Sequence, residues 1–131
     1  MPTAADLVAK KNDGTTNVTY SLVVASGGDR NPAIFRDNAL STIPKNRSRL
    51  SIEARSNAAG TARRVQTEYS YPYITTVAGV ETVSDIIPIS VSAAVPAGVP
   101  DAVVAEAVSQ WASLHGLALV KDSFKSGFAP T

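Results

Sequence analysis

Two segments of strict polar–apolar alternation constrain this fold more than any other feature of the sequence. From residue 49 to 55, the odd positions are Arg, Ser, Glu and Arg, and the even positions are Leu, Ile and Ala. From residue 64 to 71, Val, Thr and two Tyr alternate with Arg64, Gln66, Glu68 and Ser70. Side chains point to opposite faces along a β-strand, so a period of two predicts two half-buried strands. The turn-rich residues 56–61 join them into a hairpin with one polar and one apolar face, and the two tyrosines belong to the apolar face.

The rest of the first 95 residues also divides into short strands and turns. Residues 7–11 and 17–24 flank Asn12-Asp13-Gly14, which is a strong hairpin signal. Residues 33–36 form a weaker strand, residues 74–82 are expected to be a connecting loop, and residues 83–92 form another strand. Pro88 lacks a backbone donor, so this last strand is expected to be bulged or to lie at an edge. An antiparallel sheet over residues 1–95, with one solvated face, fits this order.

The hydrophobic period changes after Pro96-Ala97-Gly98, and residues 99–125 are predicted to contain two helices. Pro100 and Asp101 mark the start of the first, and Gly116 marks its end. Its apolar positions at helical spacing include Val104, Val108, Trp111 and Leu114. A second, shorter helix is expected at about residues 117–124. The fold class is therefore α+β and mainly β, within a single domain of residues 1–131.

Helix is scarce relative to the apolar sheet face that must be covered. One amphipathic helix and a short second one do not cover a sheet of five or six strands, so either the sheet curls or helices of a second copy help to cover it. The second option predicts an obligate dimer, with Val104, Val108, Trp111 and Leu114 as core or dimer contacts.

Positive charge is concentrated in one part of the chain, although the net charge is only +1. Residues 30–64 contain eight Lys or Arg and two acidic residues, which is +6, so the remainder carries −5. Such asymmetry indicates a surface for a polyanion, and solvated strand faces are the alternative explanation. The RNA-binding candidates are the basic and small polar residues of this stretch and of the following strand: Arg47, Arg49, Ser51, Arg55, Arg63, Arg64 and Gln66.

The sequence offers little for catalysis, and an enzyme is not expected. There is no cysteine, and the single His115 next to Gly116 suits the negative end of a helix dipole better than a catalytic role. The eleven acidic residues show no metal-ligand spacing, so no metal or other cofactor is expected. The N-terminus lacks a signal-peptide pattern, and no apolar run approaches the roughly 18 residues that span a bilayer, so no membrane partner is expected.

The order of these features resembles the coat proteins of single-stranded RNA bacteriophages, the leviviruses, and in particular their Q-beta-like branch. Asn12-Asp13-Gly14 corresponds to their first turn, and residues 43–52 resemble the start of their central strand. The hairpin from Arg49 to Pro72 is similar to their RNA-binding strands in length and polarity, and Ile87-Pro88-Ile89 resembles a strand tripeptide of the family. The resemblance spans nearly the whole chain.

This resemblance implies a structural protein of the virion, made in the cytoplasm of a bacterial host. Its helices would interlock with a partner's sheet in a homodimer, and dimers would assemble into an icosahedral (T=3) shell or virus-like particle around genomic RNA. An RNA hairpin at the replicase start would also be bound and its translation repressed. The family's RNA-facing positions correspond here to Arg49, Ser51, Glu53, Arg55, Arg64, Gln66 and Glu68, and its loop at the capsid axes corresponds to Thr76, Val77, Ala78 and Gly79.

Two departures from the family pattern concern the same surfaces. Glu53 and Glu68 stand where neutral or basic residues are usual in the family, and the loop after Pro72 is shorter than in its best-known members. A non-viral dimeric RNA-binding regulator with a basic sheet face is the alternative hypothesis.

Overall fold

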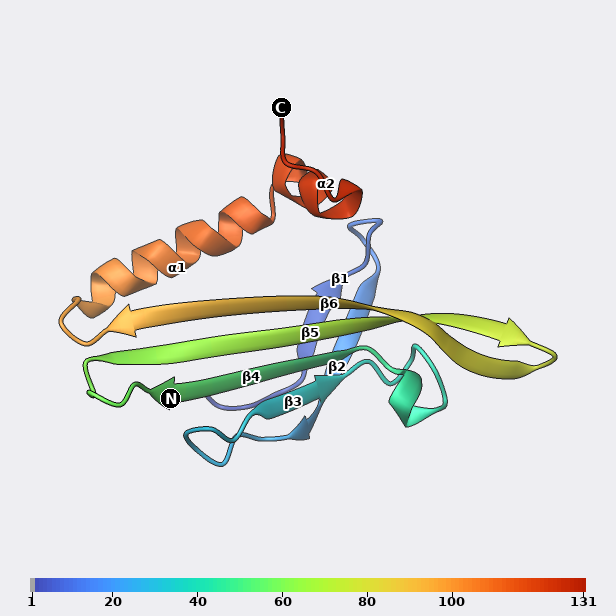
Figure 1. The fold of residues 1–131 in the computed structure, drawn as a ribbon, viewed down its shortest axis with the longest axis horizontal. Coiled ribbons are helices and arrows are strands. Elements are labelled where there is room, and N and C mark those ends of the chain that lie inside the picture. The colour runs from blue at the N-terminus through green and yellow to red at the C-terminus, as the bar shows by residue number, and fades with distance from the viewer. Residues whose placement is uncertain (1) are drawn as a thin grey trace. The chain divides into compact units, whose positions relative to one another are not determined.

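Six strands, each adjacent to the next along the chain, form an antiparallel sheet in the computed structural model, which describes residues 2–131 (Figure 1). The strands are β1 (Leu7–Lys10), β2 (Asn17–Val24), β3 (Ala33–Arg36), β4 (Arg49–Ser56), β5 (Ala62–Val77) and β6 (Val80–Pro96). A 3₁₀ turn, η1 (Pro44–Asn46), lies between β3 and β4. Two helices follow, α1 (Asp101–His115) and α2 (Ala118–Ser126). The predicted fold class is confirmed.

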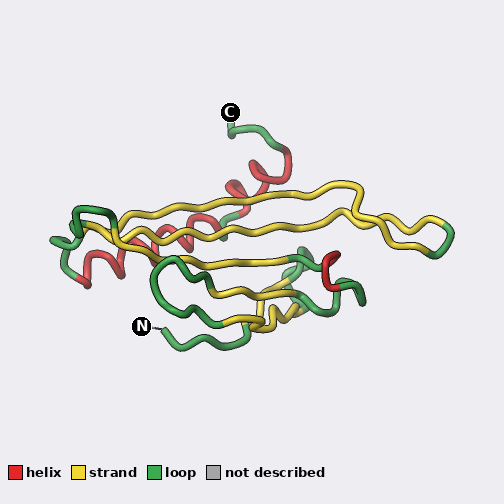
Figure 2. Tube along the Cα trace, turned by 60° about the horizontal axis from the view of Figure 1, so that its bottom comes forward, coloured by secondary structure: helices red, strands yellow, loops and turns green. Residues whose placement is uncertain are grey.

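The contacts divide the chain into two units, one that ends at Ala94 and one that begins at Val95. The first unit is the sheet, whose long strands run side by side in Figure 2, and the second consists of the helices. The predicted hairpin of residues 49–71 lies in the first unit, with Arg49 opposite Ser70 and Ser56 opposite Arg63.

The connection between β5 and β6 differs from its prediction. Residues 74–82 were expected to form a loop, but β5 continues to Val77 and β6 begins at Val80. Only Ala78 and Gly79 lie between them, with φ of 52° and 79°. Positive φ at both central residues is the signature of a two-residue type I′ turn, whose twist matches that of the flanking strands. The β-branched residues on either side, such as Thr75 and Val83, favour extended backbone and lengthen the hairpin.

The last strand, β6, lies at one end of the sheet order, as the proline within it predicted. Pro88 cannot donate to a neighbouring strand, so an edge position avoids the loss of a ladder hydrogen bond. Ile86, Ile87 and Ile89 around it are all more than a third exposed.

A small core lies on one face of the sheet. Tyr20, Ala33 and Phe35 are buried there, and partly buried apolar residues including Leu50 and Tyr69 pack against them. The Tyr20 hydroxyl lies 3.0 Å from the Ser48 Oγ and 2.9 Å from the Tyr69 hydroxyl. Burial, and then the hydrogen bond with Tyr20, raise the pKa of Tyr69 above its usual range. Tyr69 therefore lies on the apolar face, as the alternation predicted.

The second unit is a pair of helices bent by 60° at their junction. Neither helix contains a buried residue. The ring of His115 lies between those of Trp111 and Phe124, at centroid distances of 4.7 and 6.2 Å, and its Nδ1 is 2.9 Å from the Trp111 carbonyl oxygen. In residues 2–131 no single helix is long and apolar enough to cross a membrane, and the bent pair meets that test of length and composition only when taken together.

Candidate nucleic-acid interface

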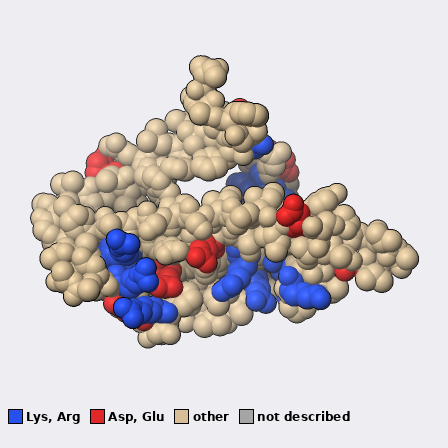
Figure 3. Space-filling view, in the orientation of Figure 1, with Lys and Arg blue, Asp and Glu red and all other residues tan. Residues whose placement is uncertain are grey.

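The polar face of β3, β4 and β5 carries most of the residues that the sequence predicted for RNA. Pairing across the strands sets them in rows: Arg36 is opposite Arg49, which is opposite Ser70. The rows that follow are Ile34 with Ser51 and Glu68, then Glu53 with Gln66, and then Arg55 with Arg64. Figure 3 shows the basic side chains in two groups over this part of the sheet, with acidic side chains between them.

Two pairs of arginines face each other across neighbouring strands, Arg36 with Arg49 and Arg55 with Arg64. Like charges directly opposite each other destabilise a sheet. Within residues 2–131 the only ion pairs closer than 4.0 Å are Arg63–Asp29 and Lys125–Asp122, so neither arginine pair is neutralised by an acidic side chain. A bound polyanion would remove this repulsion and would release its own counterions.

Arg36 was not among the residues singled out from the sequence. Its Nε is buried and has no hydrogen-bond partner among the described residues. A buried donor without an acceptor has a free-energy cost, which sets Arg36 apart from the other arginines of this face. The one sequence signal for Arg36 was its place in the basic stretch of residues 30–64. The predicted strand of residues 33–36 is too short for its alternation to show on which face of the sheet Arg36 lies.

Arg63, although next to Arg64 in sequence, is engaged elsewhere. Its guanidinium donates to Asp29 at 2.7 Å and to the Ser56 hydroxyl at 3.0 Å. The hydrogen bond from Arg63, followed by one from the Ser56 backbone N–H, holds the pKa of Asp29 below its usual value. By strand alternation Arg63 also lies on the face opposite to Arg64. It is therefore not part of the row of arginines.

Arg47 is also engaged, within the connection between β3 and β4. Its guanidinium donates to the carbonyl oxygens of Ser41 at 2.8 Å and Thr42 at 3.3 Å, and to the Asn38 side chain at 3.0 Å. Three such bonds hold this connection in place, which assigns Arg47 a structural role.

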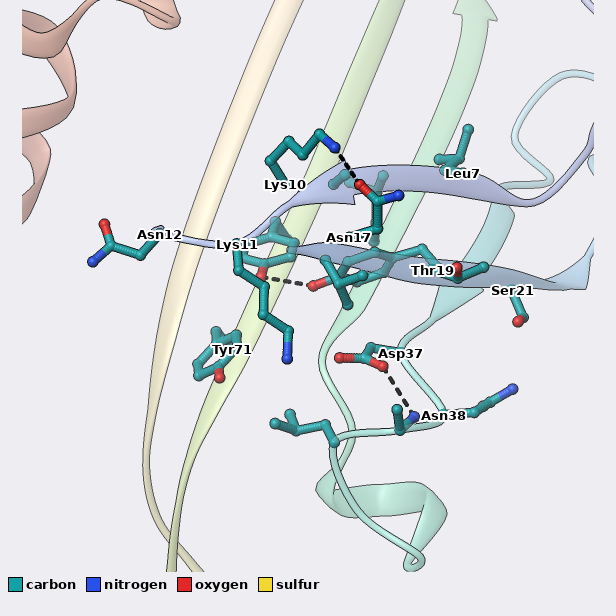
Figure 4. A pocket seen from close by; sticks show the side chains of 17 residues that line it. Leu7, Lys10, Lys11, Asn12, Asn17, Thr19, Ser21, Asp37, Asn38 and Tyr71 are labelled. Carbon is teal, nitrogen blue, oxygen red and sulfur yellow. Dashed lines mark hydrogen bonds between the residues drawn. The ribbon is translucent and has the colours of Figure 1, made fainter. Parts of the chain in front are cut away.

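The opposite face of the sheet, which carries the core, is hollowed beside the β1–β2 hairpin, where apolar and polar side chains line a groove (Figure 4). Tyr20, Leu50, Tyr69 and Tyr71 line this groove together with residues of β1 and β2. In the helical unit, the residues predicted as core or dimer contacts are not buried: Val108, Trp111 and Leu114 are 53%, 45% and 54% exposed, and Val104 is partly buried.

The residues predicted for a capsid-axis loop, Thr76, Val77, Ala78 and Gly79, form the end of β5 and the turn before β6. Just beyond them, Glu81 accepts hydrogen bonds from the Ser41 hydroxyl and, at 3.4 Å, from the Asn46 side chain. Ser41 is 6% exposed and Asn46 is 1% exposed. One carboxylate thus ties the base of the turn to the β3–β4 connection, a contact for which the sequence carried no signal.

The arrangement is suited to binding an extended polar ligand. Across residues 2–131 no group of three or more metal-ligating side chains is present. The arginine pairs, the hydroxyls of Ser51 and Ser70 and the amide of Gln66 supply cations and hydrogen-bonding groups in rows. Phosphates and the edges of unpaired bases are ligands of this kind.

Comparisons with known proteins give matches only in structure. No family model matches the sequence, and no curated protein matches it. The fold is similar to the chain of a virus-like particle of Beihai levi-like virus 21, with a TM-score of 0.82, 21% identity and coverage of 99% of this chain and 98% of that one. It is also similar to the bacteriophage EMS014 coat protein, with a TM-score of 0.79, 18% identity and coverage of 99% and 100%.

A third similar structure is the protein capsid of bacteriophage GA, with a TM-score of 0.73, 20% identity and coverage of 95% of each chain. These matches run through both units of the present chain, from the sheet to the helices. The chain therefore has the levivirus-like coat-protein fold of single-stranded RNA bacteriophages.

Proposed function

We propose that this chain is the coat protein of a single-stranded RNA bacteriophage, a structural protein without catalytic activity that self-associates into an icosahedral shell. The observation that carries the proposal is the similarity, over nearly the full length of both chains, to proteins described as virus-like particles and capsids. The location of such a protein is the virion, after synthesis in the host cytoplasm.

Self-association through a homodimer is supported by apolar surface in both units. The groove on the sheet is open, and no residue of α1 or α2 is buried. Apolar side chains left in water on this scale mark an interaction surface. The proposed partner is a second copy, whose helices would cover the apolar sheet face.

Contact with genomic RNA is proposed for the opposite face. The two arginine pairs on β3, β4 and β5 support it, because they have no acidic partner within 4.0 Å in the described part of the chain. The proposed RNA contacts are Arg36, Arg49, Ser51, Arg55, Arg64 and Gln66. Arg47 and Arg63 are left out because their guanidiniums are hydrogen-bonded within the chain. The most specific part of the proposal is that the protein binds an RNA hairpin at the replicase start and represses translation of the replicase.

The test is expression of the full chain alone, followed by electron microscopy and nuclease treatment of the purified material. We expect closed particles that contain nuclease-protected RNA. Small soluble oligomers without protected RNA would contradict the shell. If such oligomers still bound RNA through the arginine pairs, the function would instead be that of a dimeric RNA-binding regulator.

Repression has its own readout, a reporter that carries the candidate replicase start. We expect the full chain to lower its translation, and Arg49→Ala with Arg64→Ala to restore it. Unchanged translation in the presence of soluble protein would remove repression from the proposal and leave the shell intact.

A further inference from the structure

The two arginine pairs of the polar face differ in their surroundings. Arg36 is partly buried and its partner Arg49 is exposed, whereas Arg55 and Arg64 are both exposed. Among the described residues, Arg36 Nε is the one buried side-chain nitrogen or oxygen without a hydrogen-bond partner. The Arg55–Arg64 pair contains no such atom. Positive charge alone therefore does not describe the Arg36–Arg49 pair.

The Arg36–Arg49 pair is unfavourable in the single chain for two reasons. Directly opposite residues of an antiparallel pair have Cβ atoms about 4.5–5.5 Å apart, so two like charges begin close together. No acidic side chain offsets this repulsion, because the ion pairs closer than 4.0 Å in residues 2–131 are Arg63–Asp29 and Lys125–Asp122. The buried N–H of Arg36 Nε, which has no acceptor, adds a second cost.

The backbone beneath this pair is held in place by the β3–β4 connection. Directly beyond the pair, the Asp37 N–H donates to the Ser48 carbonyl oxygen at 3.2 Å. Ser48 is buried, as is Asn46 in the same connection. The two arginines therefore extend from a rigid part of the chain, and less freedom is lost when they bind a ligand.

The Arg55–Arg64 pair has a more open setting. It lies near the turn between β4 and β5, where residues 58–61 are all exposed. Its guanidiniums are open to water on both strands, so hydration satisfies their N–H groups. Such charges attract a polyanion but gain little from directed hydrogen bonds, because each bond replaces one to water.

We infer that Arg36 and Arg49 form a discrete site for one phosphate group, which fixes the position of the RNA backbone on the sheet. The inference rests on the proposed function. A phosphodiester has two charged oxygens, and each accepts more than one hydrogen bond, so both guanidiniums reach the same group. Rotation of the Arg36 side chain presents Nε–H and an Nη–H side by side to these oxygens. The phosphate thus supplies the acceptor that Arg36 Nε lacks.

One further group in the row suits the same ligand. Ser70 lies directly opposite Arg49, on the side away from Arg36, and its hydroxyl donates to the bound phosphate. A chloride ion screens the two charges but does not offer two oxygens to parallel N–H groups. The pair therefore prefers phosphate to a simple anion of the same charge.

The two arginine pairs then have different roles along one RNA strand. Figure 3 shows the basic side chains of this face in two groups, with acidic side chains between them. Arg49 and Arg55 are six residues apart on β4, which is about 20 Å along an extended strand. The RNA backbone is fixed at Arg36 and Arg49, and the Arg55–Arg64 pair attracts a more distant phosphate through charge.

Arginine-to-lysine variants test the site, because lysine keeps the charge and loses the fork of parallel donors. The full chain, freed of nucleic acid, is titrated with inorganic phosphate at constant ionic strength in chloride, and isothermal titration calorimetry measures binding. We expect Arg36→Lys and Arg49→Lys each to weaken phosphate binding about tenfold, as for the loss of one charge-assisted hydrogen bond. Arg49 is exposed, so Arg49→Lys tests the site without altering a buried position. Arg63→Lys is the matched control and should keep the affinity, because Asp29 holds Arg63.

A ten-nucleotide uridine strand tests whether the bound phosphate belongs to RNA, with fluorescence anisotropy as the readout. We expect Arg36→Lys to weaken its binding about tenfold, for the same lost bond. The slope of log K against log salt should not change, because the charge is kept. Arg64→Lys should weaken binding by less than about threefold, since lysine retains an exposed charge contact.

The outcomes separate the phosphate site from the proposed RNA contact. Phosphate binding that is absent, or that is unchanged in both Arg36→Lys and Arg49→Lys, would overturn the inference. Equal effects of Arg36→Lys and Arg64→Lys on the uridine strand would remove the fixed RNA position and leave a site for free phosphate. Absence of binding between the unaltered protein and the uridine strand would contradict the RNA contact itself.

Discussion

Single carboxylates stabilise two of the turns in this protein. Asp13 accepts backbone hydrogen bonds from Thr15 at 2.9 Å and Thr16 at 2.8 Å, and a third from the Thr16 hydroxyl. These bonds, the Thr16 hydroxyl first, lower the pKa of Asp13 to about 2. An aspartate that accepts backbone bonds two and three residues onward stabilises a turn locally. The prediction of a turn at Asn12-Asp13-Gly14 is confirmed.

The low pKa of Asp13 predicts how the stability of the protein changes at acid pH. A carboxyl whose folded-state pKa lies below its unfolded value contributes stability that is complete above the unfolded pKa of 3.8 and is lost as the pH falls toward about 2. In Asp13→Asn this contribution is absent, so the melting temperature should fall less steeply between those pH values. Thermal unfolding followed by circular dichroism checks it, and equal slopes in both proteins would contradict it.

Glu81 acts between segments that are distant in sequence. Its carboxylate satisfies the Ser41 hydroxyl and the Asn46 amide, both of which are buried. Removal of the carboxylate leaves these groups without that partner, so Glu81→Ala should lower the free energy of unfolding by about 1–3 kcal/mol. Urea denaturation at fixed protein concentration measures it.

The matched control for Glu81→Ala is Glu106→Ala, on the exposed surface of α1. It should change the same free energy by less than about 0.5 kcal/mol. Equal effects of the two substitutions would mean that the carboxylate does not support the β3–β4 connection.

At the scale of elements, the β4–β5 hairpin separates two adjacent arginines by face. Arg64 lies opposite Arg55 in the polar rows, whereas Arg63 is held by Asp29. Both residues were predicted to bind RNA, because charge and position in the sequence do not distinguish them. Only strand alternation, together with the position of Asp29 between β2 and β3, separates their surroundings.

This difference predicts unequal effects on RNA affinity. Arg64→Ala should weaken binding and reduce the slope of log K against log salt by about 1, as expected for the loss of one phosphate contact. Arg63→Ala should leave that slope unchanged. Titrations of single-stranded RNA over a range of salt concentrations measure both. Equal slopes for the two variants would contradict the assignment of faces.

The β5–β6 hairpin is the element that the sequence predicted least well. Its residues 74–83 combine β-branched side chains with Ala78-Gly79, a pair compatible with either a loop or a tight turn. The positive φ values of this pair make the turn two residues long, and β6 becomes a 17-residue strand. Turn type and loop length together fix the register of a hairpin, and Ala78-Gly79 is compatible with more than one of them.

At the scale of the whole molecule, apolar surface remains exposed in each unit. The buried core is small, and Trp111 is 45% exposed in the single chain. The shortage of helix noted from the sequence is consistent with this exposure. A second copy is the proposed cover, so stability and self-association should be coupled.

Trp111 tests that coupling. In Trp111→Ala we expect self-association to weaken and the dimer to lose about 3–5 kcal/mol of stability, the cost of truncating a buried tryptophan. Dilution-dependent unfolding and analytical ultracentrifugation measure the two effects. Gln110→Ala, at the adjacent exposed position, should leave both unchanged. An equal loss of stability at all protein concentrations would place the effect within one chain instead.

The sequence alone determined the strand–strand–helix order, the β4–β5 hairpin and the limits of α1, because these depend on local periodicity and turn chemistry. The sheet face of Arg49, Arg55 and Arg64 followed from the same alternation. Tertiary structure decided what no local pattern contains: the place of Arg36 opposite Arg49, the hydrogen bonds that hold Arg47 and Arg63 within the chain, and the contacts of Glu81. Each of these depends on which residues distant in sequence become neighbours. Only the pairing of strands and the packing of loops in the folded chain decide that.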